Sequence, residues 1–307
     1  MKQHRYEIML VGCAAFWGLA FPVIKYINGQ IDSLSFLGFR FLLADLILLL
    51  FYHSSLKNVT KNMLLPCFGL GLLFTAHSFL QIEGLRYTSA ANSSFITSTN
   101  VIFVPFFMYL FFRQKPTKNI IIGLIAVICG FLLISGIVSL QPLGIHFTTF
   151  NYGDFLTLLC ALLTALYMVI FNRLAARYDE IAVNLLHMLG ATAGTWILWL
   201  FYPDKLIAVQ DAAALIGILY CGIFATGLAF LLLAKAQAKT EASKVAILSS
   251  LEPVFATIFA TFIPDRLGNV DPLSLPTVLG GAFILYGVIK SSVNKNAEIS
   301  PALPRRE

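Results

Sequence analysis

The chain has 307 residues, of which 58% are hydrophobic and only 12% are charged, with a formal net charge of +6. A soluble globular protein carries about a quarter charged residues, so this composition excludes that class and predicts a polytopic helical membrane protein. The positive charge does not require a nucleic-acid partner, because basic residues gather in the cytoplasmic loops of membrane proteins. All five cysteines lie in apolar runs without a CxxC pair, which predicts small buried side chains rather than disulfides or metal ligands.

Ten apolar runs are long enough to form membrane-spanning helices, since about 20 helical residues cross the hydrocarbon core. The runs cover residues 7–27, 33–52, 63–84, 90–112, 117–138, 153–173, 180–201, 211–235, 242–263 and 272–292. The longest connection, 139–152, falls midway along the chain and is predicted to be a linker between two halves. The polar stretch 293–307 is predicted to be a disordered cytoplasmic tail.

Most of the 21 lysines and arginines fall on one side of the membrane when the amino terminus is placed in the cytoplasm. This bias predicts that both termini are cytoplasmic and that the number of spans is even. We therefore expect a multi-pass protein of the cell (inner) membrane, with the lipid bilayer as its surroundings.

The two halves of the chain match each other at offsets that increase along the sequence and never reverse, as loop insertions would produce. The matched pairs include Cys13 with Cys160, Gly71 with Gly222, Thr75 with Thr226, Ser98 with Ser249, Gly123 with Gly280 and Gly130 with Gly287. Individual identities of small residues are weak evidence, but their common order indicates an internal repeat.

Each repeat, 7–138 and 153–292, contains five predicted spans. Because five is odd, the second repeat must enter the membrane from the opposite side, which makes an inverted repeat. We therefore expect an all-α integral membrane fold of ten transmembrane helices in two inverted five-helix repeats. Secondary transporters have this architecture, and their substrate site lies near the midplane, where rocking of the halves opens it to each side in turn.

The first two runs each contain a residue that is unusual inside a membrane. Trp17 lies mid-span, where it either lines a cavity or packs in the core. For Arg40 in the second run we favour a structural or gating role over a ligand role. It could also extend outward along its stem or lie in the cavity near an anionic group. Its five-residue spacing from Asp45 disfavours an ion pair within the helix.

In the third run, His77 and Gln81 are four residues apart and share one helix face. A mid-span histidine is a proton relay, a substrate contact, or a neutral side chain satisfied by a neighbouring helix. In the sixth run, Tyr167 lies one turn after the repeat counterpart of Trp17 and offers a ring and a hydroxyl to a substrate. His187 in the seventh run is the counterpart of Arg40 and is expected to hold helices together.

The ninth run contains one acid, Glu252, followed directly by Pro253. A proline kinks the helix, and an ionisable side chain at bilayer depth usually faces a cavity or a partner. The pair therefore predicts a kinked helix beside a polar passage. The alternative is a structural kink whose glutamate is hydrogen-bonded to a neighbouring helix. In the first case Glu252 could bind a substrate ammonium group or carry a coupling proton.

The fourth and ninth runs are repeat partners, and both carry small polar residues and a proline, which is Pro105 in the fourth run. Small polar residues let helices approach and hydrogen-bond, which explains most of them. However, paired interrupted segments of an inverted repeat also point to the binding site. We therefore expect Thr97, Asn100, Ser249 and Glu252 at the cavity.

Several short motifs together resemble those of the EamA-type exporters of the drug/metabolite transporter superfamily, over residues 7–292. The motifs are Phe16-Trp17-Gly18, Phe39-Arg40-Phe41, Phe95-Ile96-Thr97-Ser98, Lys115-Pro116-Thr117 and Leu251-Glu252-Pro253-Val254. The resemblance implies two EamA-like five-helix repeats and transport of small metabolites, often amino acids or related compounds and usually outward. The stretch Asp265-Arg266-Leu267 departs from the family's E-R-L, and the outer loop that follows is longer.

The predicted site thus has two sets of residues. The substrate-binding set is Trp17, His77, Gln81, Thr97, Asn100, Tyr167, Ser249 and Glu252, and the gating or structural set is Arg40, Pro105, His187 and Pro253. We expect a monomer with a small-molecule substrate and no cofactor, metal or catalytic residue, and with protons as the candidate coupling ion. The alternatives are a proton-coupled drug or cation exporter, a channel, or a membrane enzyme, although HExxH, GxSxG and Walker A motifs are absent from the sequence.

Overall fold

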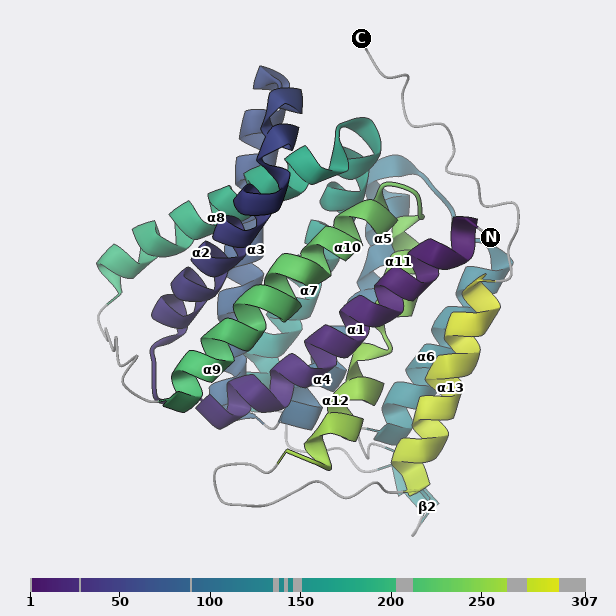
Figure 1. Ribbon diagram of the computed structural model, residues 1–307. Coiled ribbons are helices and arrows are strands. Elements are labelled where there is room, and N and C mark those ends of the chain that lie inside the picture. Colours follow the sequence, from purple (N-terminus) through teal and green to yellow (C-terminus); the bar gives the residue numbers. More distant parts are fainter. Residues whose placement is uncertain are drawn as a thin grey trace.

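The computed structural model describes residues 2–27, 29–88, 90–134, 138–140, 143–145, 151–202, 212–263 and 275–292, and these form a bundle of helices with one small hairpin (Figure 1). The first half contains α1 (Lys2–Ile27), α2 (Ser33–Tyr52), the short 3₁₀ helix η1 (His53–Asn58), α3 (Lys61–Tyr87), α4 (Ala90–Ser98), α5 (Asn100–Phe112) and α6 (Lys118–Ile134). The second half contains β1 (Val138–Leu140), β2 (Leu143–Ile145), α7 (Tyr152–Arg177), α8 (Glu180–Phe201), α9 (Ala212–Tyr220), the π-helical segment η2 (Cys221–Leu228), α10 (Ala229–Gln237), α11 (Ala242–Ser249), α12 (Glu252–Ala260) and α13 (Leu275–Ser292).

Eight helical stretches in the described ranges are long and apolar enough to cross a membrane. Two further apolar helices, Lys118–Leu133 within α6 and Val278–Ser291 within α13, are shorter. The protein is therefore an apolar, helical, multi-pass membrane protein. Parts of the predicted linker, the stretch 264–274 that contains Asp265-Arg266-Leu267, and the predicted tail 293–307 lie outside the described residues.

The fourth and ninth runs, predicted as single helices, are each two helices. The first breaks at Thr99 and the second at Ser250 and Leu251. At each break a hydroxyl bends back onto the preceding turn: Thr99 Oγ1 donates to Ile96 O at 2.6 Å, and Ser250 Oγ donates to Ile247 O at 2.5 Å. Such back-bonding bends helices. Pro253 lies in the first turn of α12, as its missing N–H favours, whereas Pro105 lies inside α5, well after the break.

The eighth run contains a feature that the sequence pattern did not predict, the π-helical turn of η2 between α9 and α10. A π-helical turn leaves backbone carbonyls with changed partners and is frequent at functional sites. Here Trp17 Nε1 on α1 donates to Ala225 O at 2.9 Å, and Cys13 Sγ donates to Ala229 O at 3.1 Å. Side chains of α1 therefore fasten it to this irregular segment.

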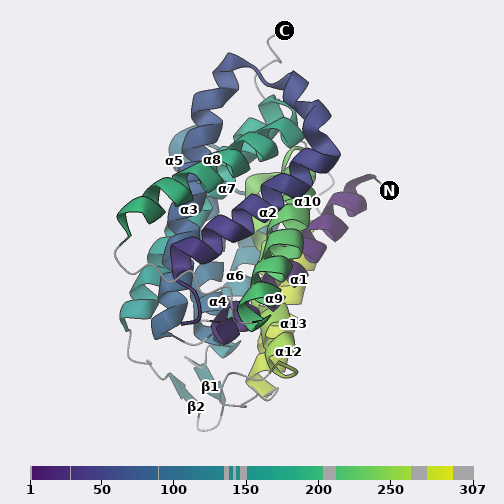
Figure 2. The ribbon, with the colours of Figure 1, turned by 60° about the vertical axis from the view of Figure 1, so that its left-hand side comes forward.

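The fold is helical as predicted, but the connection between the halves contains a short hairpin that the sequence analysis did not predict. Residues Val138–Leu140 and Leu143–Ile145 pair as an antiparallel hairpin, with Val138 opposite Ile145. The hairpin lies at the same end of the bundle as α12 (Figure 2). Backbone groups outside a helix need other partners, and this short ladder supplies them.

The helices pack across the two halves of the chain. α3 lies against α7 and α8, α1 lies against α10 and α12, and α2 lies against α8 and η2. α6 and α13 lie side by side at one edge of the bundle (Figure 1). There a Cβ atom on Gly130 would lie 2.5 Å from Gly280 O, and one on Gly123 would lie 2.8 Å from Gly287 O. Glycine is therefore needed at this seam for the two backbones to approach.

Candidate functional site

A cavity of about 70 Å³ lies in the middle of the bundle, enough room for a few water molecules. All eight residues of the predicted substrate-binding set line it: Trp17, His77, Gln81, Thr97, Asn100, Tyr167, Ser249 and Glu252. Arg40, from the gating set, lines it as well, whereas Pro105, Pro253 and His187 are not among its lining residues. The structure thus brings the predicted set together, and its binding of a substrate stays a prediction.

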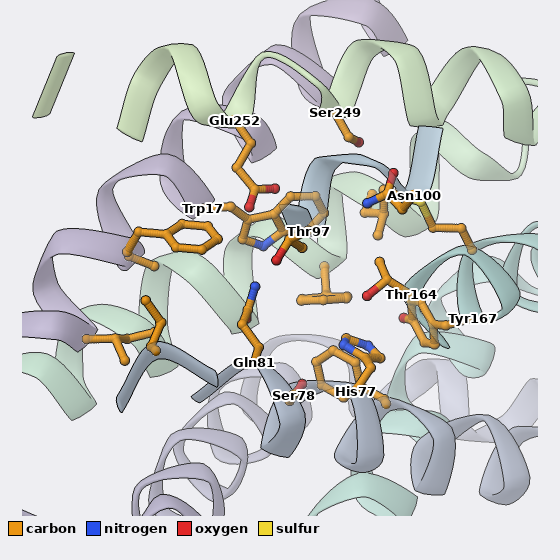
Figure 3. Close-up of a pocket in the computed structure, with 18 of the residues that line it drawn as sticks. Trp17, His77, Ser78, Gln81, Thr97, Asn100, Thr164, Tyr167, Ser249 and Glu252 are labelled. Carbon is orange, nitrogen blue, oxygen red and sulfur yellow. The ribbon is translucent and has the colours of Figure 1, made fainter. Parts of the chain in front are cut away.

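Glu252 and Ser249 form one wall of the cavity. The break between α11 and α12 places Ser249 at the end of one helix and Glu252 at the start of the next, and both side chains point into the cavity (Figure 3). α1 approaches closely at Gly18, where a Cβ atom would lie 2.9 Å from Glu252 O. The side chain of Glu252 is buried and makes no hydrogen bond or ion pair with any residue in the described ranges. The alternative of a glutamate hydrogen-bonded to a neighbouring helix is therefore not the arrangement seen.

α3 forms the opposite wall. His77, Ser78 and Gln81 point from this helix towards the wall that carries Glu252 (Figure 3). Three buried polar atoms of residues that line the cavity, His77 Nε2, Thr97 Oγ1 and Ser249 Oγ, have no hydrogen-bond partner within the described part of the chain. Leaving such an atom unsatisfied costs about 1–3 kcal/mol, so these atoms are suited to bind water or a polar solute.

An aromatic cluster supports the α3 wall. The ring of Phe74 packs on His77, Tyr167 and Phe230, with ring centroids 5.0, 5.4 and 4.7 Å away. The hydroxyl of Tyr167 is hydrogen-bonded to His187 Nε2 at 3.1 Å. Tyr167 therefore lines the cavity while its hydroxyl is hydrogen-bonded to His187, and its contact with a substrate stays a prediction.

The aromatic ring of Trp17 also faces the cavity, while its nitrogen is engaged with Ala225 O. Phe21 and Ile24, four and seven residues further along α1, line the cavity too. The sequence analysis did not select them, although this helical spacing from Trp17 was the signal that could have found them.

Arg40 is buried, and its Nε donates to Thr226 Oγ1 at 2.5 Å. Asp45 instead accepts a hydrogen bond from Thr192 Oγ1 at 2.5 Å. The described ranges contain no ion pair between Arg40 and Asp45. Extension of Arg40 outward along its stem is not observed, because its side chain lines the cavity.

Polar ties join helices at both ends of the cavity. At one end, Lys25 Nζ donates to Leu85 O at 2.8 Å and to Thr88 O at 2.7 Å, at the end of α3. At the other end, Asn172 Nδ2 donates to Gln237 O and Thr240 O, both at 2.8 Å, at the end of α10.

A partly buried ion pair lies at the same end as the Asn172 tie. Lys244 Nζ on α11 and Glu7 Oε1 on α1 are 2.7 Å apart. This pair fastens α1 to α11 beyond the last cavity-lining residue of α1. No group of three or more His, Cys, Asp or Glu side chains in the described ranges is placed to hold a metal ion.

Comparison with known proteins gives consistent results over nearly the whole chain. The model of the EamA-like transporter family matches residues 4–136 and 151–289. An uncharacterized transporter of Archaeoglobus fulgidus is 28% identical over 92% of this chain and 96% of its own length. The uncharacterized transporter YyaM of Bacillus subtilis is 24% identical over 95% of each chain.

A solved crystal structure has a similar fold, with a TM-score of 0.72 and 15% sequence identity. The alignment covers 93% of this chain and 96% of that one. At this identity the likeness shows the fold alone.

Proposed function

Because this chain belongs to the EamA-like transporter family, we propose that it is a secondary transporter that exports small metabolites across the cell (inner) membrane. Amino acids and related compounds are the first candidates as substrate. The observation that carries the proposal is the central cavity, which both halves of the chain line with polar side chains. A buried carboxylate and unpartnered polar atoms are costly inside a membrane protein, and their presence around the cavity is explained if they bind a solute or a proton.

The proposed architecture is ten membrane helices in two inverted repeats, with α6 and α13 as the fifth and tenth. The glycine seam supports it. In the internal repeat, Gly123 corresponds to Gly280 and Gly130 corresponds to Gly287. A two-fold axis exchanges the members of each pair, so it converts a contact between Gly123 and Gly287 into a contact between Gly280 and Gly130. Both contacts occur where α6 and α13 cross.

Two more contacts repeat in the same way. A Cβ atom on Gly222 would lie 3.1 Å from Arg40 O, and a Cβ atom on Gly71 would collide with His187 O. These residues are repeat partners, Gly71 with Gly222 and Arg40 with His187. The two helix breaks also correspond, since Thr99 and Ser250 follow the matched pair Ser98 and Ser249.

In the proposed cycle the two halves rock about the central cavity, so that the ties at its two ends break in turn. With the amino terminus in the cytoplasm, the Lys25 tie lies at the outer end of the cavity and the Asn172 tie at the inner end. Both ties contain side-chain hydrogen bonds to carbonyls at helix ends, and such bonds can exchange with water at modest net cost.

The test is counterflow into proteoliposomes that hold a trapped mixture of amino acids. We expect labelled external amino acid to exchange with the trapped pool, with saturation as for a carrier. An imposed pH gradient then shows whether protons drive the flux. If no amino acid exchanges while other small metabolites do, the amino-acid assignment falls and the carrier remains. A flux without saturation or counterflow would instead indicate a channel.

A drug or cation exporter is the second candidate, because Glu252 is an acid without a described partner. The probe is ethidium, loaded into the same vesicles. Efflux of ethidium that needs Glu252, together with no amino-acid exchange, would favour this candidate.

A further inference from the structure

Arg40 is a buried base without an acidic partner in the described part of the chain. Only 6% of its surface is exposed, and it lines the central cavity. Its Nε donates to Thr226 Oγ1. Its terminal nitrogens, Nη1 and Nη2, make no hydrogen bond to a residue in the described ranges. The carboxylate closest in sequence, Asp45, is engaged with Thr192.

The cavity contains a buried base and a buried acid, Arg40 and Glu252. Glu252 points into the cavity from the wall formed by α11 and α12 (Figure 3). No ion pair joins Arg40 and Glu252 in the described structure. The cavity lining therefore carries one basic and one acidic side chain that are not paired with each other.

The geometry of Arg40 suits a carboxylate. A guanidinium is a planar fork whose terminal N–H groups bind a carboxylate with two parallel hydrogen bonds. The bond from Nε to Thr226 holds one edge of the plane and leaves the terminal edge for a ligand. A buried charge that lacks a partner is strongly unfavourable, so an anionic group that enters the cavity gains from pairing with it.

We propose that Arg40 binds the carboxylate of a zwitterionic substrate whose ammonium group lies near Glu252. This inference rests on the proposed transport function and assigns its substrate class, a small amino acid. A cationic solute would leave Arg40 unpaired, and an anionic solute would leave Glu252 unpaired. A zwitterion satisfies both side chains without adding net charge to the cavity. Phe21, Leu85 and Leu233 also line the cavity and would contact an apolar side chain.

The test separates the two ends of the ligand. The amino acid that exchanges best in the counterflow assay is compared with its amide and its deaminated acid; for leucine these are leucinamide and 4-methylpentanoate. In the wild type, we expect each analogue to compete at least about 10-fold more weakly than the zwitterion, because it lacks one charged hydrogen-bonded group.

The variants then assign each end to a residue. In Arg40→Gln, the amide and the zwitterion should compete equally, while the preference over the deaminated acid remains. Glu252→Gln should do the reverse. Arg40→Lys keeps the charge without the fork and should retain part of the discrimination against the amide.

Thr226→Val is the matched control for a purely structural role, since it removes the bond to Nε and leaves the guanidinium in place. It should keep more of the discrimination against the amide than Arg40→Gln does. Equal weakening of all three ligands in Arg40→Gln and Thr226→Val would overturn the inference, and so would equal competition by leucine and leucinamide in the wild type. In both cases leucine still exchanges, so the transport function survives. If no amino acid exchanges in the wild type, both proposals fail for amino acids.

Discussion

Glu252 is the side chain that would bind a coupling proton in the cavity. We expect Glu252→Gln to abolish uptake driven by a pH gradient while exchange of labelled for unlabelled substrate persists. The amide has a similar shape and can still hydrogen-bond, but it cannot take up and release a proton. The measurement is gradient-driven uptake and counterflow in the same proteoliposome preparation.

Glu241→Gln is the matched control for this change, because Glu241 precedes α11 and is not a lining residue of the cavity. Both fluxes should persist in it. Complete loss of exchange as well as driven uptake in Glu252→Gln would contradict this prediction, because it would show that the amide cannot replace the carboxylate in substrate binding or in folding.

Tryptophan, tyrosine and polar side chains inside apolar runs were the signal that pointed to eight of the residues that line the cavity, whereas Ser78 and Thr164, which also line it, were not selected. The use of each polar atom was not predictable, because it depends on partners from distant parts of the chain. The hydroxyl of Tyr167 is engaged by His187, and the nitrogen of Trp17 by Ala225. The pairing of Arg40 with Thr226 is likewise visible only in the fold.

At the scale of the elements, the seam between α6 and α13 gives a stability prediction. We expect Gly130→Ala to destabilise the protein by about 1–3 kcal/mol and to lower its thermal unfolding temperature by about 2–8 °C. The added methyl group would meet the backbone oxygen of Gly280, and a backbone atom has little room to move. Thermal unfolding in detergent measures the shift.

Gly69→Ala is the control for this substitution. Gly69 also lies in a helix, α3, but a Cβ atom there meets nothing within 4 Å. It should leave the unfolding temperature unchanged or raise it slightly, since alanine favours the helix. Equal effects of the two substitutions would show that the α6–α13 crossing is looser than described.

The positions of the helices followed from apolar run length, but their irregularities did not. The break at Thr99 depends on a side-chain hydrogen bond to Ile96 O, whereas the sequence directed attention to Pro105. The π-helical turn near Ala225 is stabilised by contacts from α1, which is far away in sequence. Local patterns do not record such contacts, and they predict irregular backbone poorly.

At the scale of the whole molecule, the two end ties should have opposite effects on access to the cavity. We expect Lys25→Met to open the outer side and Asn172→Ala to open the inner side. Each change removes donors to the terminal carbonyls of one helix, α3 or α10. The measurement is labelling of a Gln81→Cys reporter by a membrane-impermeant maleimide from the outside, in a background without native cysteines.

Labelling should be faster in the Lys25→Met background and slower in the Asn172→Ala background than in the reporter alone. Arg86→Met is the control, because Arg86 lies on the same helix end as Leu85 but is exposed and interacts with Glu83 within its own helix. Changes of the same sign in both tie variants would contradict the assignment of the two ties to opposite sides.

The position of Trp17 makes its fluorescence a probe of what occupies the cavity. The chain has three tryptophans, and the other two, Trp196 and Trp199, both lie on α8. Replacing these two with phenylalanine leaves a single indole, whose ring lines the cavity and whose nitrogen is held by Ala225. The fluorescence emission maximum of that indole should shift to longer wavelength when water fills the cavity and to shorter wavelength when an apolar solute displaces the water. The occupancy of the transport path could thus be followed in real time with light alone, without a label or a gradient.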